Sequence, residues 1–370
     1  MKAYLCLQDG KIFAGKAIGI VGEAVGEVVY YTGMTGYQEI ITDPCSEGQI
    51  IVFTYPLIGN CGVNSVDEES SGARAKGIVI KELSSNPSNY RAKENLHKYL
   101  VSQGLVGITD IDTRALTKHL RRHGTMMGLI SMEDNLTELV KKAKELSVNN
   151  GEQQLVKKVT TKETVTFPEG QYPVVVIDLG TKKSLLRALR ARDCRVTLVG
   201  AATGAEEILN YQPQGVVLSN GPGNPEDVED VLPVIKKILQ LNIPVLGIGL
   251  GHLLLGKALG GTVYRLQSGH RGNYPVKEIK TGRVYQTSQN HDYVLRDDSF
   301  FADEVEITLR NLHDQSVEGI RHKMTGSYSV QFNPEGCPGP REAEVFLDEF
   351  VEMVKGNQLG GGKGCLKYQD

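Results

Sequence analysis

The C-terminal half of the chain alternates short apolar runs with amphipathic segments. The first run, 174–177, is continuously apolar and β-branched, which is typical of a strand buried on both faces of a parallel sheet. A helix is predicted over 184–192, where Leu and Ala recur at helical spacing, and further helices over 205–210 and 228–241. This order predicts an open, doubly wound α/β domain with its sites at the carboxyl ends of the strands. The predicted strands are 174–177, 195–199, 215–218 and 243–248.

The first part of the chain has a different pattern. Residues 24–31 and 77–81 have the character of strands, and a helix is predicted over 113–122. We therefore predict two domains, a mixed α/β domain over residues 1–146 and the doubly wound domain over 173–355.

Two polar segments are predicted to lie outside these domains. Residues 147–172 are rich in Lys, Thr and Gln and contain Pro168 and Gly170, which is typical of a connector. Residues 356–370 are rich in Gly and carry too little apolar surface to fold alone, so we expect a flexible tail there.

Composition and charge exclude several classes of protein. The chain has 370 residues, 40% of them hydrophobic, and 41 Lys and Arg against 44 Asp and Glu. It lacks the basic excess that nucleic-acid phosphates require, so no nucleic-acid partner is expected. No apolar run approaches the roughly 20 residues that span a bilayer, and the start turns polar too soon for a signal peptide. We expect a cytoplasmic protein without membrane contact.

The cysteines and histidines show no metal-binding or disulfide pattern. The chain has no C-x-x-C pair and no His at zinc-finger spacing, so neither a disulfide framework nor structural zinc is expected. His119 and His123 stand one helical turn apart without the intervening Glu of a zinc protease, and we interpret them as a solvated helix face. The cysteines are Cys6, Cys45, Cys61, Cys194, Cys337 and Cys365.

Residues 245–256 carry the most informative pattern, because an apolar strand passes through closely spaced glycines directly into an apolar helix. A dinucleotide fingerprint is disfavoured, since the third glycine is off by one position and no acidic residue follows about 20 residues later. The glycines could instead allow close packing of strand and helix. A third interpretation is a nucleophile elbow, G-x-Nuc-x-G, with Gly249 at the nucleophile position beside a helix N-terminus.

This segment resembles the elbow of class I glutamine amidotransferases, whose usual form is G-I-C-L-G-H-Q. Over nearly all of residues 1–355 the chain resembles the small subunit of carbamoyl-phosphate synthetase. The N-terminal motifs are the more specific, because many amidotransferases share the C-terminal fold. Besides the elbow, the motifs are Met34–Pro44, Thr54–Asn60, Asp67–Ser70, Asp110–Arg114, Ser219–Gly223, Ser288–His291 and Gln331–Pro340.

The resemblance implies a catalytic triad whose reacting groups this chain lacks. The family uses a Cys thiolate, an activating His and an orienting acid to convert glutamine into a thioester and ammonia. These positions hold Gly249, Asn333 and Glu335. Glycine has no nucleophilic atom, and Asn cannot act as a base near neutral pH. A side chain at an elbow also carries strain of about 1–3 kcal/mol, which glycine removes.

The glutamine pocket implied by the resemblance has changed as well. Leu253 stands in place of the usual Gln, Cys45 in place of Ser, and Asp292 and Tyr293 in place of Gly and Phe, while residues 269–273 are one residue shorter than in the family. A carboxylate at Asp292 would border an amino-acid ligand, and changes at so many positions indicate natural loss of the glutaminase site. The matching pocket positions are Gly221, Gly223, Leu250 and Asn290.

The resemblance further implies a large ATP-grasp partner subunit that makes carbamoyl phosphate from bicarbonate, ATP and a nitrogen source, for arginine or pyrimidine synthesis. ATP and Mg are expected on that partner, and no cofactor or metal in this chain. Loss of Cys and His predicts that ammonia replaces glutamine and that this chain is a scaffold or allosteric element. Assemblies of more than one such heterodimer are compatible with this expectation.

Two alternatives stay open. Cys45 or Cys337 could supply a replacement thiol, although without His at position 333 its activation is unexplained. The altered pocket could instead hold another small ligand, which would make the chain a non-catalytic sensor. His252, directly after the elbow, is expected to be a packed, hydrogen-bonded residue rather than a base.

Overall fold

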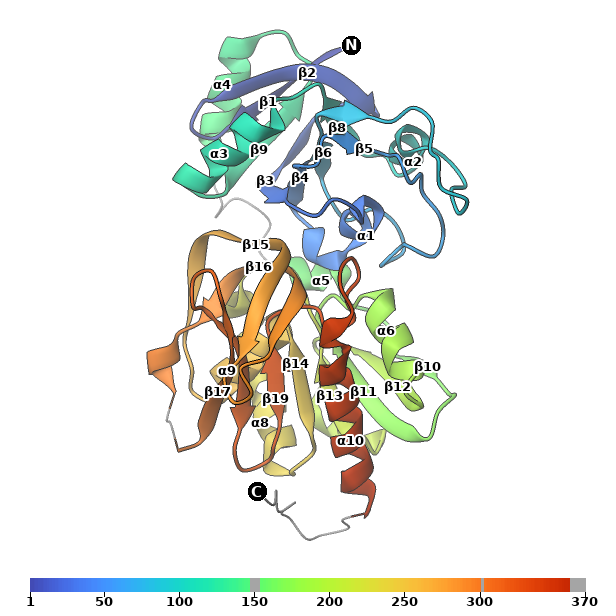
Figure 1. The fold of residues 1–370 in the computed structure, drawn as a ribbon, viewed down its shortest axis with the longest axis vertical. Coiled ribbons are helices and arrows are strands. Elements are labelled where there is room, and N and C mark those ends of the chain that lie inside the picture. The colour runs from blue at the N-terminus through green and yellow to red at the C-terminus, as the bar shows by residue number, and fades with distance from the viewer. Residues whose placement is uncertain (147–153, 301–302, 360–370) are drawn as a thin grey trace.

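The N-terminal domain is built around a closed β-barrel (Figure 1). The computed structural model describes residues 1–146, 154–300 and 303–359, and the barrel strands follow the order β1-β2-β8-β6-β4-β3-β9. Closure leaves this sheet without a free edge strand. The strands are β1 (Lys2–Leu7), β2 (Ile12–Gly19), β3 (Ala24–Tyr31), β4 (Gln49–Phe53), β6 (Gly77–Val79), β8 (Val106–Thr109) and β9 (Met126–Ser131).

Both faces of the barrel wall are covered with apolar side chains. In β4, Ile50 and Val52 pack in a cluster that includes side chains of α3, whereas Ile51 and Phe53 pack in a second cluster with α1 and α2. Successive strand residues point to opposite faces, so one apolar run serves both clusters. The helices are α1 (Tyr37–Thr42), α2 (Leu96–Ser102), α3 (Thr113–His123) and α4 (Leu136–Glu145); the short elements are η1 (Pro44–Ser46), β5 (Leu57–Ile58) and β7 (Glu82–Leu83).

The C-terminal domain contains a ten-stranded sheet of order β10-β12-β11-β13-β14-β19-β18-β16-β15-β17 among the described residues. Five strands that are adjacent in this order pair in parallel, namely β12, β11, β13, β14 and β19. The other neighbouring strands pair antiparallel. The strands are β10 (Val165–Phe167), β11 (Tyr172–Asp178), β12 (Cys194–Gly200), β13 (Gly215–Leu218), β14 (Val245–Ile248), β15 (Val263–Glu278), β16 (Val284–Leu295), β17 (Val305–Asn311), β18 (Val317–His322) and β19 (Tyr328–Val330).

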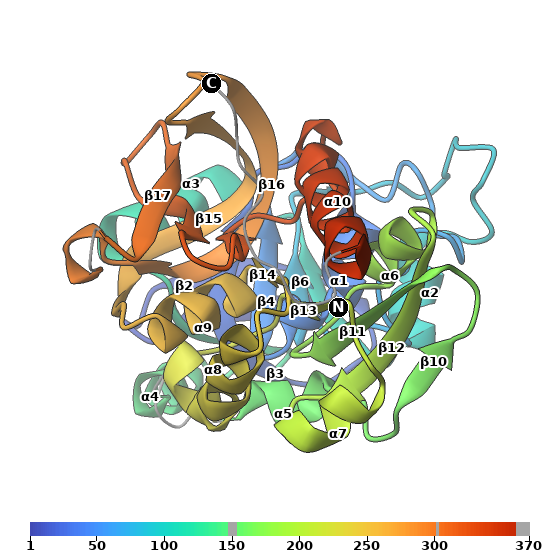
Figure 2. The same cartoon turned by 90° about the horizontal axis from the view of Figure 1, so that it is seen from below.

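Helices cover both faces of the parallel part of the sheet, so the predicted doubly wound architecture is confirmed (Figure 2). Val174 and Val176 of β11 pack with α6 and α10 on one face, and Val175 and Ile177 pack with α8 and α9 on the other. The helices are α5 (Leu155–Val159), α6 (Lys183–Arg190), α7 (Ala205–Asn210), α8 (Leu232–Gln240), α9 (Leu250–Ala258) and α10 (Val345–Leu359), with 3-10 turns η2 (Pro225–Val231), η3 (Asp297–Ser299) and η4 (Glu342–Glu344).

Three segments differ from the sequence-based expectation. The predicted connector 147–172 contains α5 and β10, and β10 pairs with β12, so its second part belongs to the C-terminal sheet. The predicted helix 228–241 begins only at Leu232, because a kink at Val228 separates η2 from α8. The predicted tail begins within α10, which runs to Leu359. Residues 147–153 and 360–370 lie outside the described part of the chain.

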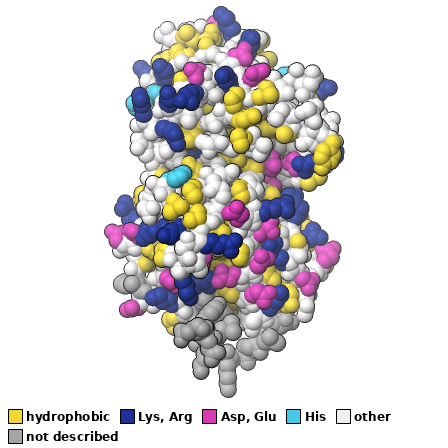
Figure 3. Space-filling view, viewed as in Figure 1, with side chains coloured by type: hydrophobic (Ala, Val, Ile, Leu, Met, Phe, Trp, Pro, Cys, Tyr) yellow, Lys and Arg dark blue, Asp and Glu magenta, His cyan; other side chains and the backbone are white. Residues whose placement is uncertain are grey.

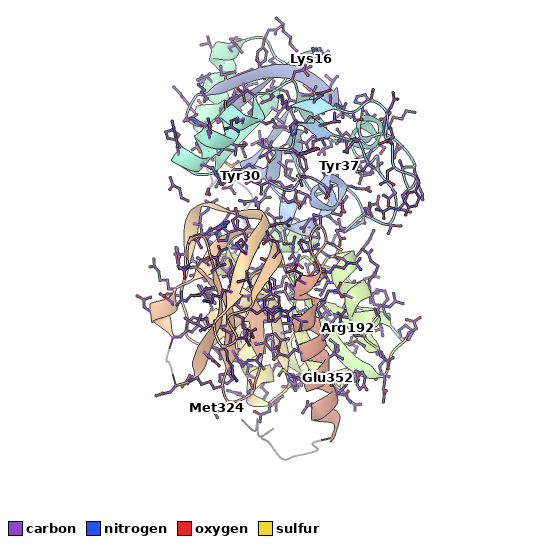
Figure 4. All side chains as sticks on the ribbon, in the orientation of Figure 1. Lys16, Tyr30, Tyr37, Arg192, Met324 and Glu352 are labelled. Carbon is purple, nitrogen blue, oxygen red and sulfur yellow. The ribbon has the colours of Figure 1, made fainter. Side chains whose placement is uncertain are left out.

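Polar contacts, some of them buried, join the two domains. The Glu69 carboxylate accepts hydrogen bonds from the backbone N–H and Oγ of Ser184, at 2.9 and 2.6 Å. Thr32 Oγ1 donates to the carbonyl of Arg271 at 2.9 Å. Tyr30 and Tyr37 lie on the side of the barrel domain that faces the second domain (Figure 4). The junction therefore contains satisfied hydrogen bonds, which fix the relative position of pocket residues contributed by both domains.

The outer surface of α3 is basic. Lys and Arg side chains gather over this helix (Figure 3), and Arg121 and Arg122 lie in its last turn. His123 is exposed, as predicted, whereas His119 is partly buried and contacts Asp9 Oδ2 at 2.5 Å. No helix in the described part of the chain is long and apolar enough to cross a membrane.

Candidate functional site

Gly249 forms the turn between β14 and α9. Its φ of 55° and ψ of −110° place it in a region that residues with a Cβ rarely adopt. A Cβ built on Gly249 would lie 3.3 Å from the nearest side-chain atom, the Cβ of Asn220, which is a tight contact, so backbone strain and a small shift of Asn220 both limit this position. At Gly251, by contrast, a Cβ would come within 2.2 Å of the Leu218 carbonyl. The segment thus combines an elbow at Gly249 with a close-packed glycine after it.

A pocket of about 40 Å³ opens beside the elbow, enough for roughly three waters at about 10–15 Å³ each on the same measure. The structure brings Gly249 and Asn333, the positions that the resemblance assigns to the nucleophile and the base, to its wall, together with every pocket position that the resemblance implied. Glu335 does not line it. The lining residues are Cys45, Gln49, Asn220, Gly221, Pro222, Gly223, Gly249, Leu250, Leu253, Arg271, Asn290, His291, Asp292, Tyr293, Gln331 and Asn333.

Glu335, which the resemblance implies as the orienting acid, is paired with a lysine. Its Oε1 accepts a hydrogen bond from Lys182 Nζ at 2.8 Å, and both side chains are almost completely buried. Lys182 Nζ also donates to the carbonyl of Cys337. Burial alone would lower the pKa of Lys182, but Glu335, Glu69 and Asp43 together hold it well above its ordinary value. In this chain the acid therefore neutralises a buried ammonium.

The two candidate replacement thiols are not activated. Burial and the Asp43 carboxylate raise the pKa of Cys45 well above its ordinary value, and burial also raises that of Cys337. Asn220 Nδ2 donates to Cys45 Sγ at 3.4 Å, and Cys337 Sγ donates to the Glu335 carbonyl at 3.7 Å. Within the described residues neither sulfur hydrogen-bonds to an imidazole. Both thiols therefore stay protonated at neutral pH, whereas nucleophilic attack needs the thiolate.

Asp292, at the position where the family has glycine, is paired with a buried arginine that sequence reasoning missed. Arg271 Nη2 donates to Asp292 Oδ2 at 2.6 Å, and Arg271 is 3% exposed. Burial alone would raise the pKa of Asp292, but the guanidinium holds it below its ordinary value. Arg265 forms a second ion pair nearby, with Glu27 of the barrel domain. The pocket wall therefore carries a charged pair in place of a small neutral residue.

His252 is packed behind the elbow, as predicted. It is completely buried, and its Nδ1 lies 2.8 Å from Ser329 Oγ. Burial lowers its pKa to about 3, so the ring is neutral at physiological pH. Five of the six cysteines are free thiols, and Cys365 lies outside the described residues.

The fold and the site define the class of protein. The doubly wound sheet and the sharp turn between a strand and a helix N-terminus agree with a class I glutamine amidotransferase domain, and the family model "Glutamine amidotransferase class-I" matches residues 175–353. The model "Carbamoyl-phosphate synthase small chain, CPSase domain" matches residues 5–130. The chain belongs to the carbamoyl phosphate synthase small chain family.

Two curated relatives align with nearly the whole of this chain. The carbamoyl phosphate synthase small chain of Listeria monocytogenes serotype 4b (strain F2365) is 45% identical over 361 residues, which cover 97% of this chain and 98% of the relative. That of Streptococcus agalactiae serotype III (strain NEM316) is 46% identical over 356 residues, which cover 96% and 98%. Among solved structures, a glutamine amidotransferase from Thermotoga maritima is 18% identical, covers 51% of this chain and 91% of its own, and has a TM-score of 0.37.

Proposed function

We propose that this chain is a small subunit of carbamoyl phosphate synthase that has lost glutamine hydrolysis and serves its large partner as a scaffold or allosteric element. The observation that carries the proposal is the elbow, which keeps its geometry while Gly249 offers no nucleophile. Asn333 removes the base. A residue without a side chain cannot form the thioester on which glutamine hydrolysis depends.

Two features of the pocket support loss of the reaction over its transfer to another residue. Cys45 and Cys337 have raised pKa values, so neither supplies a thiolate. Glu335 does not line the pocket, and its Oε1 is paired with the buried ammonium of Lys182. Restoring activity would therefore require more than a single thiol. A surviving glutaminase would be revealed by labelling with a glutamine-analogue electrophile that Cys45→Ala or Cys337→Ala removes.

The partner in this proposal is a large ATP-grasp subunit that carries ATP and Mg and makes carbamoyl phosphate from bicarbonate. Ammonia from solution supplies the nitrogen. Carbamoyl phosphate then serves arginine or pyrimidine synthesis. No step of this scheme takes place on the small chain, whose role is to hold the partner in an active state.

The test is the nitrogen source of the reconstituted pair. We expect ammonium to support carbamoyl phosphate synthesis, and glutamine to give no more product than a reaction without a nitrogen source. The measurement compares initial rates with each source, and the control pairs the same large subunit with a glutaminase-competent small chain. Efficient use of glutamine by the pair would refute the proposal.

A second candidate function, ligand sensing, is favoured by unpartnered polar atoms in the pocket wall. Asn220 Oδ1, Arg271 Nε, Asp292 Oδ1 and both amide atoms of Gln331 are buried without hydrogen-bond partners among the described residues. All four residues line the pocket. Buried polar atoms are normally satisfied, so this set fits a small polar ligand with both donors and acceptors.

A thermal-shift screen of amino acids and nucleotides tests the sensing function. A ligand at about 100 times its Kd should add roughly 2.7 kcal/mol to the free energy of unfolding. Asp292→Asn, which keeps the shape of the wall and removes its charge, should abolish the shift if the ligand binds in this pocket. A screen without shifts would count against sensing.

A further inference from the structure

Three strands of the C-terminal sheet bring two imidazoles and a carboxylate together next to the pocket. His270 of β15 and His291 of β16 stand opposite each other in the strand register, and Glu318 comes from β18. One ligand atom from each residue lies within 4.8 Å of the other two. The two rings are 4.9 Å apart between centroids. Two imidazoles bound to one tetrahedral Zn²⁺ have a similar separation of about 5 Å, given Zn–N bonds of about 2.0–2.1 Å.

Glu318 is incompletely satisfied in this cluster. It is fully buried, and its Oε1 accepts a hydrogen bond from Asn311 Nδ2 at 2.8 Å and lies 3.5 Å from His270 Nδ1. Its Oε2 is buried without any hydrogen-bond partner among the described residues. Oε1 already faces the His270 ring, whereas a buried carboxylate oxygen without a donor or a cation is costly, so Oε2 is the atom open to a further cation.

A second carboxylate orients His270 from the outside. Asp314 Oδ2 lies 2.9 Å from His270 Nε2, while Asp314 Oδ1 accepts hydrogen bonds from the backbone and hydroxyl of Ser316. In the tautomer in which Nε2 donates to Asp314, the unprotonated Nδ1 lies 3.4 Å from Asn311 Nδ2 and 3.5 Å from Glu318 Oε1, and it can ligate an ion that displaces the Asn311 contact. A carboxylate that fixes the outer nitrogen of a ligating histidine is the usual arrangement around protein metal ions.

We propose that His270, His291 and Glu318 bind a divalent transition-metal ion of the Zn²⁺ type. Two imidazoles and one carboxylate form the donor set of this class and leave at least one position for water. The donor atoms close around the ion by side-chain rotation, and His291 gives up one of its contacts to Tyr293 O or Gln289 Oε1, both at 3.1 Å. Because His291 lines the pocket, the ion fixes one wall of it by joining β15, β16 and β18.

The test is metal binding by the untagged full-length chain after removal of metal with a chelator. Titration with Co²⁺, followed by its visible absorption, and competition with Zn²⁺ should give one tight site per chain. All variants carry His123→Asn, which removes the exposed histidine pair of α3 as a competing site. Glu318→Gln should weaken binding by more than about 100-fold, and Asp314→Asn, which removes only the orienting carboxylate, by about 10–100-fold.

His322→Gln is the matched control, since this imidazole lies at the end of β18 and contacts Thr325 instead of the cluster. It should leave the affinity for Co²⁺ unchanged. If Glu318→Gln does not fold, Asp314→Asn decides, because the Asp314 side chain is partly exposed and its replacement is mild. The proposal fails if the chain binds neither ion, or if Asp314→Asn binds as tightly as the background chain.

Discussion

Replacing Gly249 by Cys is expected to create a reactive thiol where the natural chain has none. The new Cβ requires a shift of a few tenths of an ångström at Asn220. The thiol would stand at the N-terminus of α9, where the helix dipole and free N–H groups favour a thiolate. Incubation with iodoacetamide at neutral pH, followed by mass spectrometry, should show one rapidly modified site in Gly249→Cys. Cys45 and Cys337 should react slowly in both chains, because their pKa values are raised.

Adding Asn333→His to Gly249→Cys is expected to raise glutamine hydrolysis by roughly 10²–10⁴ over the single variant, the usual contribution of a general base. Both variants are measured with and without Asp292→Gly, since the carboxylate at Asp292 narrows the space for an amino acid. Asn333→His alone is the matched control and should stay inactive. If the natural chain already hydrolyses glutamine as fast as the double variant, no activity is missing, and the loss of function assigned to Gly249 and Asn333 is wrong.

Backbone strain at the elbow is also expected to make the Gly249→Cys variant less stable than the natural chain. A side chain at φ 55° and ψ −110° should lower the free energy of unfolding by about 1–3 kcal/mol. Gly204→Ala is the comparison, because Gly204 has a negative φ and no atoms within 4 Å of an added Cβ. Its change should stay within about 1 kcal/mol. A reactive but less stable Gly249→Cys would show that glycine relieved a strain that the nucleophile once required.

The regular parts of the fold follow from local pattern. Strand 24–31, strand 215–218 and helix 205–210 coincide with β3, β13 and α7. The order of strands and helices in the second half was sufficient for the doubly wound architecture, because parallel strands need covered faces and crossover helices. The closed barrel was not predictable in this way. It depends on pairing of β1 with β9 and of β2 with β8, and alternation along one strand does not specify its distant partner.

The burial of charged residues around the site was likewise not predictable from local sequence patterns. Lys182 and Arg271 would ordinarily be interpreted as exposed, and their burial depends on Glu335 and Asp292, which are distant in sequence. Asp292 did contain a usable signal, since a carboxylate in place of glycine at a buried position calls for a countercharge on a neighbouring strand. The cluster of His270, His291 and Glu318 is likewise assembled by strand register, so no spacing in the sequence predicts it.

Lys182→Met is expected to lower the stability of the chain more than Gly249→Cys does. Glu335 would lose its hydrogen-bonding partner while buried, and Asp43 and Glu69 would lose the ammonium that stabilises them electrostatically. Breaking a buried ion pair by removing one partner typically costs about 3–5 kcal/mol. Urea unfolding of the full chain should show this as a lower midpoint with an unchanged slope.

A double-mutant cycle with Glu335→Gln separates the pair from its surroundings. If the main cost of Lys182→Met is an uncompensated charge on Glu335, the double variant should regain part of the loss, because the buried carboxylate is gone. The control is the exposed pair between Lys355 and Glu352 on α10, with side chains 39% and 71% exposed; Glu352 is labelled in Figure 4. Lys355→Met should change stability by less than about 1 kcal/mol, since water screens that pair. If Lys182→Met is as stable as the natural chain, the ammonium does not balance the acids at the junction, and the assignment of Glu335 to a structural role is wrong.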